Sequence, residues 1–262
     1  MAASVLITGA SSGIGAALAK AYAARGAHLA LLARREEPLA ELAQSLAGAH
    51  SVHAVDVTDH DAMQRAAAAE IASHGCPDIV IANAGISLGT LTEHPEDHAA
   101  FKRVVDTNLL ASFSTFAPFV AAMKARGSGT LVGIASMAGI RGLPGAEAYS
   151  ASKAAMISYC ESLRVELRGT GVRVVTIAPG YIATPMTASN RYPMPFLMNA
   201  DRFAARALAA IDRGASFTVI PWQMGVTARV MRVLPNWLYD ALFSGAPRKA
   251  RPAADGSDKR SR

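Results

Sequence analysis

The sequence places a tyrosine and a lysine one helical turn apart. Tyr149 and Lys153 stand at positions i and i+4 of a helix-forming stretch that runs to about Arg168, so their side chains share one helix face. An ammonium group beside a phenol stabilises the phenolate and lowers the phenol pKa, which suits proton transfer to or from a substrate oxygen. Many helices contain this spacing by chance, so its meaning depends on the residues around it.

Two further polar residues stand where a ligand could meet that pair. Ser136 directly follows the apolar run 130–135, so we expect it at the carboxyl edge of a sheet, where ligands bind in such folds. Asn108 lies within an otherwise apolar helical stretch, and a buried amide there must find partners. Its side chain either bonds locally or orders a chain of water molecules.

A glycine-rich turn follows the first apolar run and opens the first helical stretch. Glycine allows a tight turn and a close approach of the backbone to a ligand. The N-terminus of the following helix offers N–H groups and a positive dipole end to a pyrophosphate. The spacing is GxxxGxG instead of the common GxGxxG. A turn without a ligand is the alternative, but its place in a βαβ unit favours a dinucleotide site. The residues are Thr8, Gly9, Ser11, Ser12, Gly13, Ile14 and Gly15.

The ends of the second and third strands bear on which dinucleotide binds. Arg34 and Arg35 stand where the common fingerprint has a carboxylate for the ribose 2′-hydroxyl. A guanidinium group binds a 2′-phosphate well, so we predict NADP(H), with NAD(H) less favoured. The alternative is two solvated arginines at a helix start. Asp56 and Val57 end the third strand; the carboxylate either accepts from an adenine amino group or caps the helix that begins near Asp59.

Short apolar runs separated by helical stretches predict an α/β protein with a doubly wound parallel sheet. We expect about seven strands, at residues 5–8, 27–33, 52–55, 79–82, 130–135, 172–177 and 217–220. A length of 262 residues with 51% hydrophobic residues suits one domain over residues 1–245. The Pro-, Gly- and charge-rich residues 246–262 are predicted to form a disordered basic tail. The apolar stretch 107–123 is predicted to be a buried helix and not a membrane span.

These motifs, in this order, resemble the short-chain dehydrogenase/reductase family. The resemblance covers about residues 3 to 220 and adds Asn83, Ala84 and Gly85 as well as Pro179 and Gly180. One departure is Ala82, where the family often has a second Asn. The resemblance implies a Rossmann fold and a nicotinamide cofactor. It also implies a homodimer or homotetramer formed through the helices that carry Asn108 and Tyr149.

The resemblance also implies a role for each candidate residue. Tyr149 would be the general acid/base, and Lys153 would hold the nicotinamide ribose and tune Tyr149. Ser136 would bond the substrate oxygen, and Asn108 would anchor a proton-relay water. Further cofactor contacts would come from Ile182 and Thr184.

Two later segments bear on the substrate and on possible partners. Residues 186–200 are rich in Met, Pro and aromatic residues, and the resemblance places the substrate lid here, which favours an apolar carbonyl compound or alcohol. The alternative is a loop that packs on the sheet edge. Residues 224–244 have apolar residues at helical spacing, and we expect Pro235 to split them into two helices. Contact of this segment with a membrane surface is possible but not favoured.

The charge and the remaining residue types exclude several other functions. Six of the basic residues and two of the acidic ones fall in 246–262, which leaves only +2 of the formal charge of +6 for the body. Aromatic residues do not cluster with the arginines, so no nucleic-acid partner is expected. The histidines show no metal-ligand spacing, so no metal is expected.

Two cysteines favour a reducing, cytoplasmic location. A non-catalytic NADP-binding regulator on the same fold is the alternative function.

Overall fold

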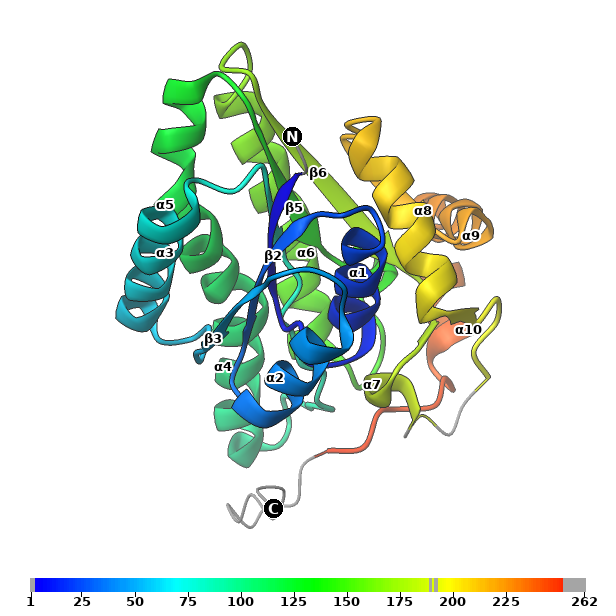
Figure 1. Ribbon diagram of the computed structural model, residues 1–262. Coiled ribbons are helices and arrows are strands. Elements are labelled where there is room, and N and C mark those ends of the chain that lie inside the picture. The colour runs from blue at the N-terminus through cyan, green and yellow to red at the C-terminus, as the bar shows by residue number, and fades with distance from the viewer. Residues whose placement is uncertain (1–2, 189, 191–192, 252–262) are drawn as a thin grey trace.

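The computed structural model describes residues 3–188, 190 and 193–251. Its centre is a parallel sheet of seven strands in the order β3-β2-β1-β4-β5-β6-β9 (Figure 1). The chain starts at β1 and winds outward first in one direction and then in the other, so the predicted doubly wound α/β fold is confirmed. Tyr192, part of the expected lid, lies outside the described residues.

The seven strands fall within a residue or two of the apolar runs that predicted them. The sheet strands are β1 Ser4–Thr8, β2 His28–Ala33, β3 Ser51–Ala54, β4 Ile79–Ala82, β5 Gly129–Ile134, β6 Val172–Pro179 and β9 Phe217–Ile220. The larger helices are α1 Gly13–Ala23, α2 Glu36–Ser45, α3 His60–His74, α4 His98–Val105, α5 Ala111–Arg126, α6 Glu147–Glu166, α8 Ala200–Asp212, α9 Trp222–Val233 and α10 Asn236–Phe243. Shorter elements are η1 Pro95–Asp97, η2 Asp106–Leu110, η3 Met137–Gly139, β7 Ile182–Ala183, α7 Pro185–Ala188 and β8 Met198–Asn199.

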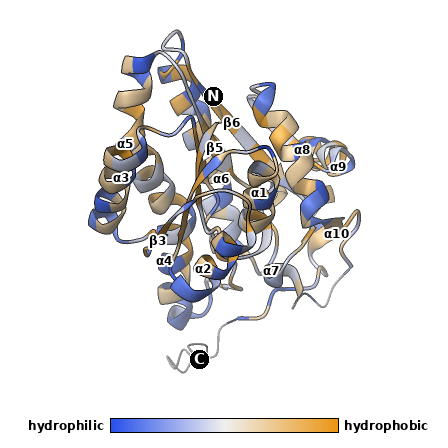
Figure 2. Cartoon of the chain, in the orientation of Figure 1, coloured by the Kyte–Doolittle hydropathy of each residue, from blue (hydrophilic) through white to orange (hydrophobic). Residues whose placement is uncertain are grey.

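The sheet is buried on both faces, which explains why its strands read as continuous apolar runs. On one face α1, α2 and α8 pack on side chains such as Ile7 and Leu31. On the other face α3, α5 and α6 cover side chains such as Leu6 and Leu131. Figure 2 shows hydrophobic residues concentrated in the strands between the two helical layers. This two-sided core fixes the strand ends, and all seven parallel strands have their carboxyl ends at one edge, where the candidate site lies.

The turn between β1 and α1 depends on close backbone packing. Gly9 and Gly13 have φ values of +66° and +56°, a region that favours glycine. A Cβ atom on Gly15 would lie 2.2 Å from the carbonyl oxygen of Gly9 and 2.7 Å from Nδ2 of Asn83. The spacing GxxxGxG is therefore required by contacts of the turn with itself and with the loop after β4.

A continuous helical run covers residues Pro95–Arg126 and is long and apolar enough to cross a membrane by length and composition alone. One side of α5 supplies Phe116 and Phe119 to the sheet core, as predicted for the stretch 107–123. Within the run, η2 is a single π-helical turn that contains Asn108. Turns of this kind are rare in proteins as a whole, and those that occur are often found at functional sites.

The C-terminal region agrees with the prediction in one respect and differs from it in another. Helices α9 and α10 separate at Pro235 as expected, and Val230, Val233 and Trp237 of their apolar stripe are exposed. Residues 246–251, predicted to begin a disordered tail, lie against the body. The guanidinium group of Arg251 donates to the carboxylates of Asp97 (2.8 Å) and Glu96 (2.9 Å). These ion pairs bridge more than 150 residues of sequence, which composition alone does not reveal.

A substitution of Gly15 tests the packing of the β1–α1 turn. We expect Gly15→Ala to lower the free energy of unfolding by about 1–3 kcal/mol, because the added methyl group must displace the backbone of Gly9. Urea unfolding measures the loss. Gly245→Ala is the control, because a Cβ there meets nothing within 4 Å. Equal stability of the two variants would contradict the packing argument.

Candidate active site

A cleft of about 390 Å³ opens where the loops after the first six sheet strands meet. Most of the residues singled out from the sequence line it. They are Gly9, Ser11, Ser12, Gly13, Ile14, Arg34, Arg35, Asp56, Val57, Asn83, Ala84, Gly85, Ser136, Tyr149, Lys153, Pro179, Gly180, Ile182 and Thr184. Residues far apart in the sequence thus form one continuous wall.

Thr8, Gly15 and Asn108 do not line the cleft. They contact the residues that do, and hold them in place. The Thr8 hydroxyl donates to the carbonyl oxygen of Ile81 at 3.3 Å and accepts from the backbone N–H groups of Asn83 and Ala84 at 3.1 and 3.2 Å. The Asn83 amide donates to the carbonyl oxygens of Thr8 (2.9 Å) and Gly9 (3.3 Å). The loop after β4 is therefore tied to the glycine turn after β1, with Ala82 buried in the strand.

Lys153 brings a cation into the interior of the protein. The residue is 4% exposed, and its ammonium group donates to the carbonyl oxygen of Ile134, the last residue of β5, at 2.8 Å. Burial lowers the pKa of Lys153 to about 8, against a smaller opposing effect of Cys160. Lys153 is therefore mostly charged at pH 7 and loses its proton in a range that kinetics can reach.

Tyr149 lies beside Lys153, with the ammonium nitrogen 5.9 Å from the centre of the phenol ring. Burial raises the pKa of Tyr149, and the hydrogen bond with Ser136 offsets part of that rise. The direction is opposite to the lowering predicted from the Tyr–Lys spacing, because loss of water around the phenol is the larger effect. The phenol therefore holds its proton at neutral pH and is a potential donor.

Asn108 joins the cleft loop to the helix that carries Tyr149 and Lys153. Its amide nitrogen donates to the carbonyl oxygen of Ile86 (2.9 Å) and to Oγ of Ser152 (3.0 Å). Its amide oxygen accepts from the backbone N–H of Ile86 at 2.8 Å. These partners lie 22 and 44 positions away in the sequence, so the alternative of local bonding within the helix is wrong. It fixes the loop after β4 against α6, next to Lys153.

The end of β3 excludes one of the two alternatives for Asp56. The N-cap of α3 is Asp59, which accepts from the N–H of Ala62 at 2.9 Å, so the expectation that Asp56 caps this helix is wrong. Asp56 instead accepts from the backbone N–H and hydroxyl of Thr58 (2.9 and 2.8 Å), which closes a local turn. Its other oxygen lies 4.0 Å from the guanidinium group of exposed Arg34. Arg34 and Asp56 therefore share one mouth of the cleft.

A second pocket of about 280 Å³ adjoins the cleft and is mainly apolar. The two cavities share Ser136, Tyr149, Pro179, Gly180, Met186 and Thr187. Its other walls include Met137, Leu143, Tyr181, Met224, Phe243 and Lys249. Of the expected lid residues, Met186 of α7 faces both cavities, whereas Met198 is buried in the core and Phe196 is exposed.

Several lining residues could not be chosen from the sequence. Arg103 and Thr107 reach the cleft from α4 and η2, and Thr187 reaches it from α7. Phe243 and Lys249 enter the second pocket because the segment after α10 folds back over it. Thr107 stood next to Asn108, and Thr187 and Phe243 fell within the segments 186–200 and 224–244 that the sequence singled out. The others depend on tertiary contacts between distant segments.

Comparison with known proteins agrees with this geometry. Residues 3–194 match the short chain dehydrogenase family. The chain belongs to the short-chain dehydrogenase/reductase family. It is 42% identical over 239 residues to an uncharacterized oxidoreductase of Myxococcus xanthus, covering 90% of this chain and 94% of that protein. The family assignment makes this chain an oxidoreductase, and the family uses nicotinamide cofactors.

Two solved structures of the family share the fold. A short-chain dehydrogenase from Streptomyces avermitilis has a TM-score of 0.78 at 24% identity, covering 93% of this chain and 99% of that one. The L-sorbose reductase from Gluconobacter frateurii, solved with NADPH and L-sorbose, has a TM-score of 0.76 at 24% identity. That alignment covers 83% of this chain and 94% of the reductase. At this identity the likeness concerns the fold alone.

The lowered pKa of Lys153 predicts the pH dependence of this oxidoreductase. As the pH rises through about 8 the ammonium loses its charge, so kcat/KM for carbonyl reduction should fall about tenfold per pH unit above that point. Lys153→Arg keeps its charge, so its remaining activity should stay level to a higher pH. A wild-type profile that is flat to pH 9.5 would contradict the role of the Lys153 charge.

Proposed function

We propose that the enzyme transfers a hydride between NADP(H) and the carbonyl or secondary alcohol group of an apolar substrate. The observation that carries the proposal is the position of Ser136 and Tyr149, which line both cavities. Two hydroxyl groups at the junction of a cofactor-sized cleft and a smaller apolar pocket can bond one substrate oxygen there. A non-catalytic regulator would have no use for a buried phenol and ammonium at this junction.

The cleft residues fit a phosphorylated dinucleotide. α1 begins at Gly13 inside the cleft, has no acidic residue in its first turn and has no side-chain cap on Ser12. The helix N-terminus therefore offers its N–H groups and positive dipole end to a diphosphate. Arg34 and Arg35 line the same cleft, and a guanidinium pair favours a 2′-phosphate. The L-sorbose reductase that shares this fold was solved with NADPH, which supports the proposal that this enzyme uses NADP(H).

The residues at the junction divide the proton chemistry between them. When bound, the cofactor supplies the hydride that adds to the carbonyl carbon. Tyr149 holds its proton at neutral pH and donates it to the substrate oxygen. Ser136 donates a second hydrogen bond to that oxygen and positions it. The charge of Lys153 stabilises the phenolate that remains, and Asn108 holds the adjoining loop in place.

The second pocket determines which carbonyl compounds bind. Its walls are mainly side chains such as Met137, Leu143, Met224 and Phe243, which favour an apolar body. Among its described lining residues Lys249 is the only charged one, and burial lowers the pKa of this lysine. An apolar ketone or aldehyde fits these walls better than a sugar, because the lining is mainly apolar.

We also propose a homodimer or homotetramer through the helices that carry Asn108 and Tyr149, since members of the family often oligomerise. The outer side of this region presents Leu110 and Phe113, which are 56% and 54% exposed. A second copy of the chain would remove these apolar side chains from water.

Removal of one oxygen atom tests the acid/base role. We expect Tyr149→Phe to lower kcat by about 10²–10⁴-fold, because the phenol proton is lost while the ring still fills its site. NADPH oxidation over a panel of apolar aldehydes and ketones measures turnover, and fluorescence titration measures NADPH binding, which should be unchanged. Tyr159→Phe, on the same helix but away from both cavities, is the control.

Either of two results would contradict this assignment. One is ketone reduction by Tyr149→Phe at the wild-type rate. The other is a wild-type protein that binds NADPH tightly and reduces no carbonyl compound, which would favour the regulator.

The arginine pair at the end of β2 predicts the cofactor preference. We expect wild type to have a higher kcat/KM with NADPH than with NADH. Arg34→Ala combined with Arg35→Ala should reduce that ratio by about 100-fold, through loss of charge-assisted hydrogen bonds to the 2′-phosphate. Arg168→Ala removes an exposed arginine outside the cleft and should leave the ratio unchanged. A preference for NADH in the unmodified enzyme would refute the role of this pair.

A further inference from the structure

A buried carboxylate surrounded by histidines lies at the edge of the sheet opposite to the active site. Glu70, in the last turns of α3, is 1% exposed. His28 and Ser51 are the first residues of β2 and β3, whereas the active site lies beyond the carboxyl ends of these strands. The spacing of the histidines predicted no metal site, because the residues of this cluster come from two strands and a helix. The fold brings them together.

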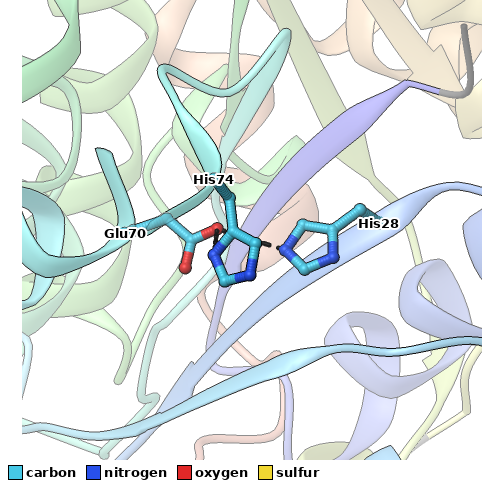
Figure 3. A group of neighbouring side chains, drawn as sticks. All are labelled: His28, Glu70 and His74. Atoms are coloured by element: carbon cyan, nitrogen blue, oxygen red, sulfur yellow. Dashed lines mark hydrogen bonds and ion pairs between the residues drawn. The ribbon is translucent and has the colours of Figure 1, made fainter. Parts of the chain in front are cut away.

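Three atoms of this cluster are placed as ligands of one ion. Oε1 of Glu70 lies 3.3 Å from Nε2 of His28 and 3.4 Å from Nδ1 of His74. All three atoms lie within 4.8 Å of one another, and Figure 3 shows both imidazole rings next to the carboxylate. Zinc bonds to nitrogen and carboxylate oxygen are about 2.0–2.2 Å long, so tetrahedral ligand atoms are about 3.3 Å apart. Two of the three separations match that value.

The orientation of His28 turns one ring nitrogen toward the carboxylate. Nδ1 of His28 lies 3.0 Å from the carbonyl oxygen of Ala49. A carbonyl oxygen only accepts, so Nδ1 is the donor in this bond, and Nε2 is the ring nitrogen that faces Oε1 of Glu70. Metal-bound histidines commonly donate their other ring N–H to a backbone carbonyl in this way.

The second oxygen of Glu70 is held by protein donors. Oε2 accepts from Oγ of Ser51 at 2.6 Å and pairs with Nε2 of His53 at 3.1 Å. These bonds fix the plane of the carboxylate and leave Oε1 to face the two other histidines. A carboxylate ligand that is itself hydrogen-bonded through its second oxygen is typical of built metal sites.

The histidines of this cluster are partly exposed to solvent, and its carboxylate is not. The side chain of His74 is 41% exposed and that of His28 is 24% exposed, whereas Glu70 is buried. An ion can therefore enter past His74 and keep a water molecule as its fourth ligand. A buried carboxylate is costly unless it is paired or binds a cation, and imidazole with carboxylate suits zinc better than magnesium or calcium.

We propose that His28, Glu70 and His74 form a zinc site, with Ser51 and His53 orienting the carboxylate. The ion would join the end of α3 to the start of β2. Since the site lies away from both cavities, it would stabilise the fold and take no part in hydride transfer. The proposal does not depend on the proposed function.

Zinc binding to the full chain tests the proposal directly. Equilibrium dialysis against Zn²⁺, followed by metal analysis, should show one equivalent bound to wild type. His28→Gln and His74→Gln should each bind at least tenfold more weakly. His98→Gln, which changes an exposed histidine outside the cluster, should bind like wild type. At zinc concentrations about 100 times Kd, the Tm of wild type should rise by about 5 °C or more, and Mg²⁺ should not replace Zn²⁺.

Several results would overturn the proposal. Failure of wild type to bind zinc would refute the site. Equal binding by wild type, His28→Gln and His74→Gln would place the ion elsewhere, and so would loss of binding in His98→Gln. Far-UV circular dichroism of each variant checks that it is folded. His74 is partly exposed, so we expect His74→Gln to fold, and this variant tests the site even if His28→Gln does not fold.

Discussion

The ammonium group of Lys153 donates to the carbonyl oxygen of Ile134 at 2.8 Å while only 4% of the residue is exposed. A buried cation is costly unless its donors are used. Among the described residues this carbonyl is its one hydrogen-bond acceptor, so two of its three donors remain for a ligand in the cleft. The bond also fixes α6 to the end of β5. Because Tyr149 lies on α6, the bond also fixes the position of Tyr149 relative to the end of β5. The catalytic geometry therefore depends on where this one ammonium group is held.

The core layers and two groups of hydrogen bonds hold Lys153 and the surrounding loops in place. The core layers fix the ends of the strands, and Asn108 bonds both Ile86 and Ser152, which holds the loop after β4 against α6. Thr8 and Asn83 tie that loop to the glycine turn. The cleft proposed for the cofactor and the Tyr149–Lys153 pair thus share one rigid support. The pocket proposed for the substrate has a different origin, because part of its wall comes from the segment after α10.

The sequence predicted the parts of the structure that depend on local pattern. Seven apolar runs sufficed for the strands, because a sheet buried on both faces needs continuous apolar residues, and the i, i+4 spacing sufficed to bring Tyr149 and Lys153 together. Properties that depend on long-range packing were missed. The raised pKa of Tyr149 comes from burial by distant segments, and Arg251 finds Asp97 across 154 residues. The histidines around Glu70 likewise have no common spacing and meet only in the folded chain.

Isotope transfer tests the central claim of this account most directly. NADPH with deuterium at the transferable C4 position is incubated with the enzyme and apolar ketones, and the alcohol product is examined by mass spectrometry and NMR. We predict one deuterium atom on the carbinol carbon, with the hydroxyl proton derived from solvent through Tyr149. Deuterium that is absent from the carbinol carbon although NADPH is consumed would contradict hydride transfer at the junction of the two cavities.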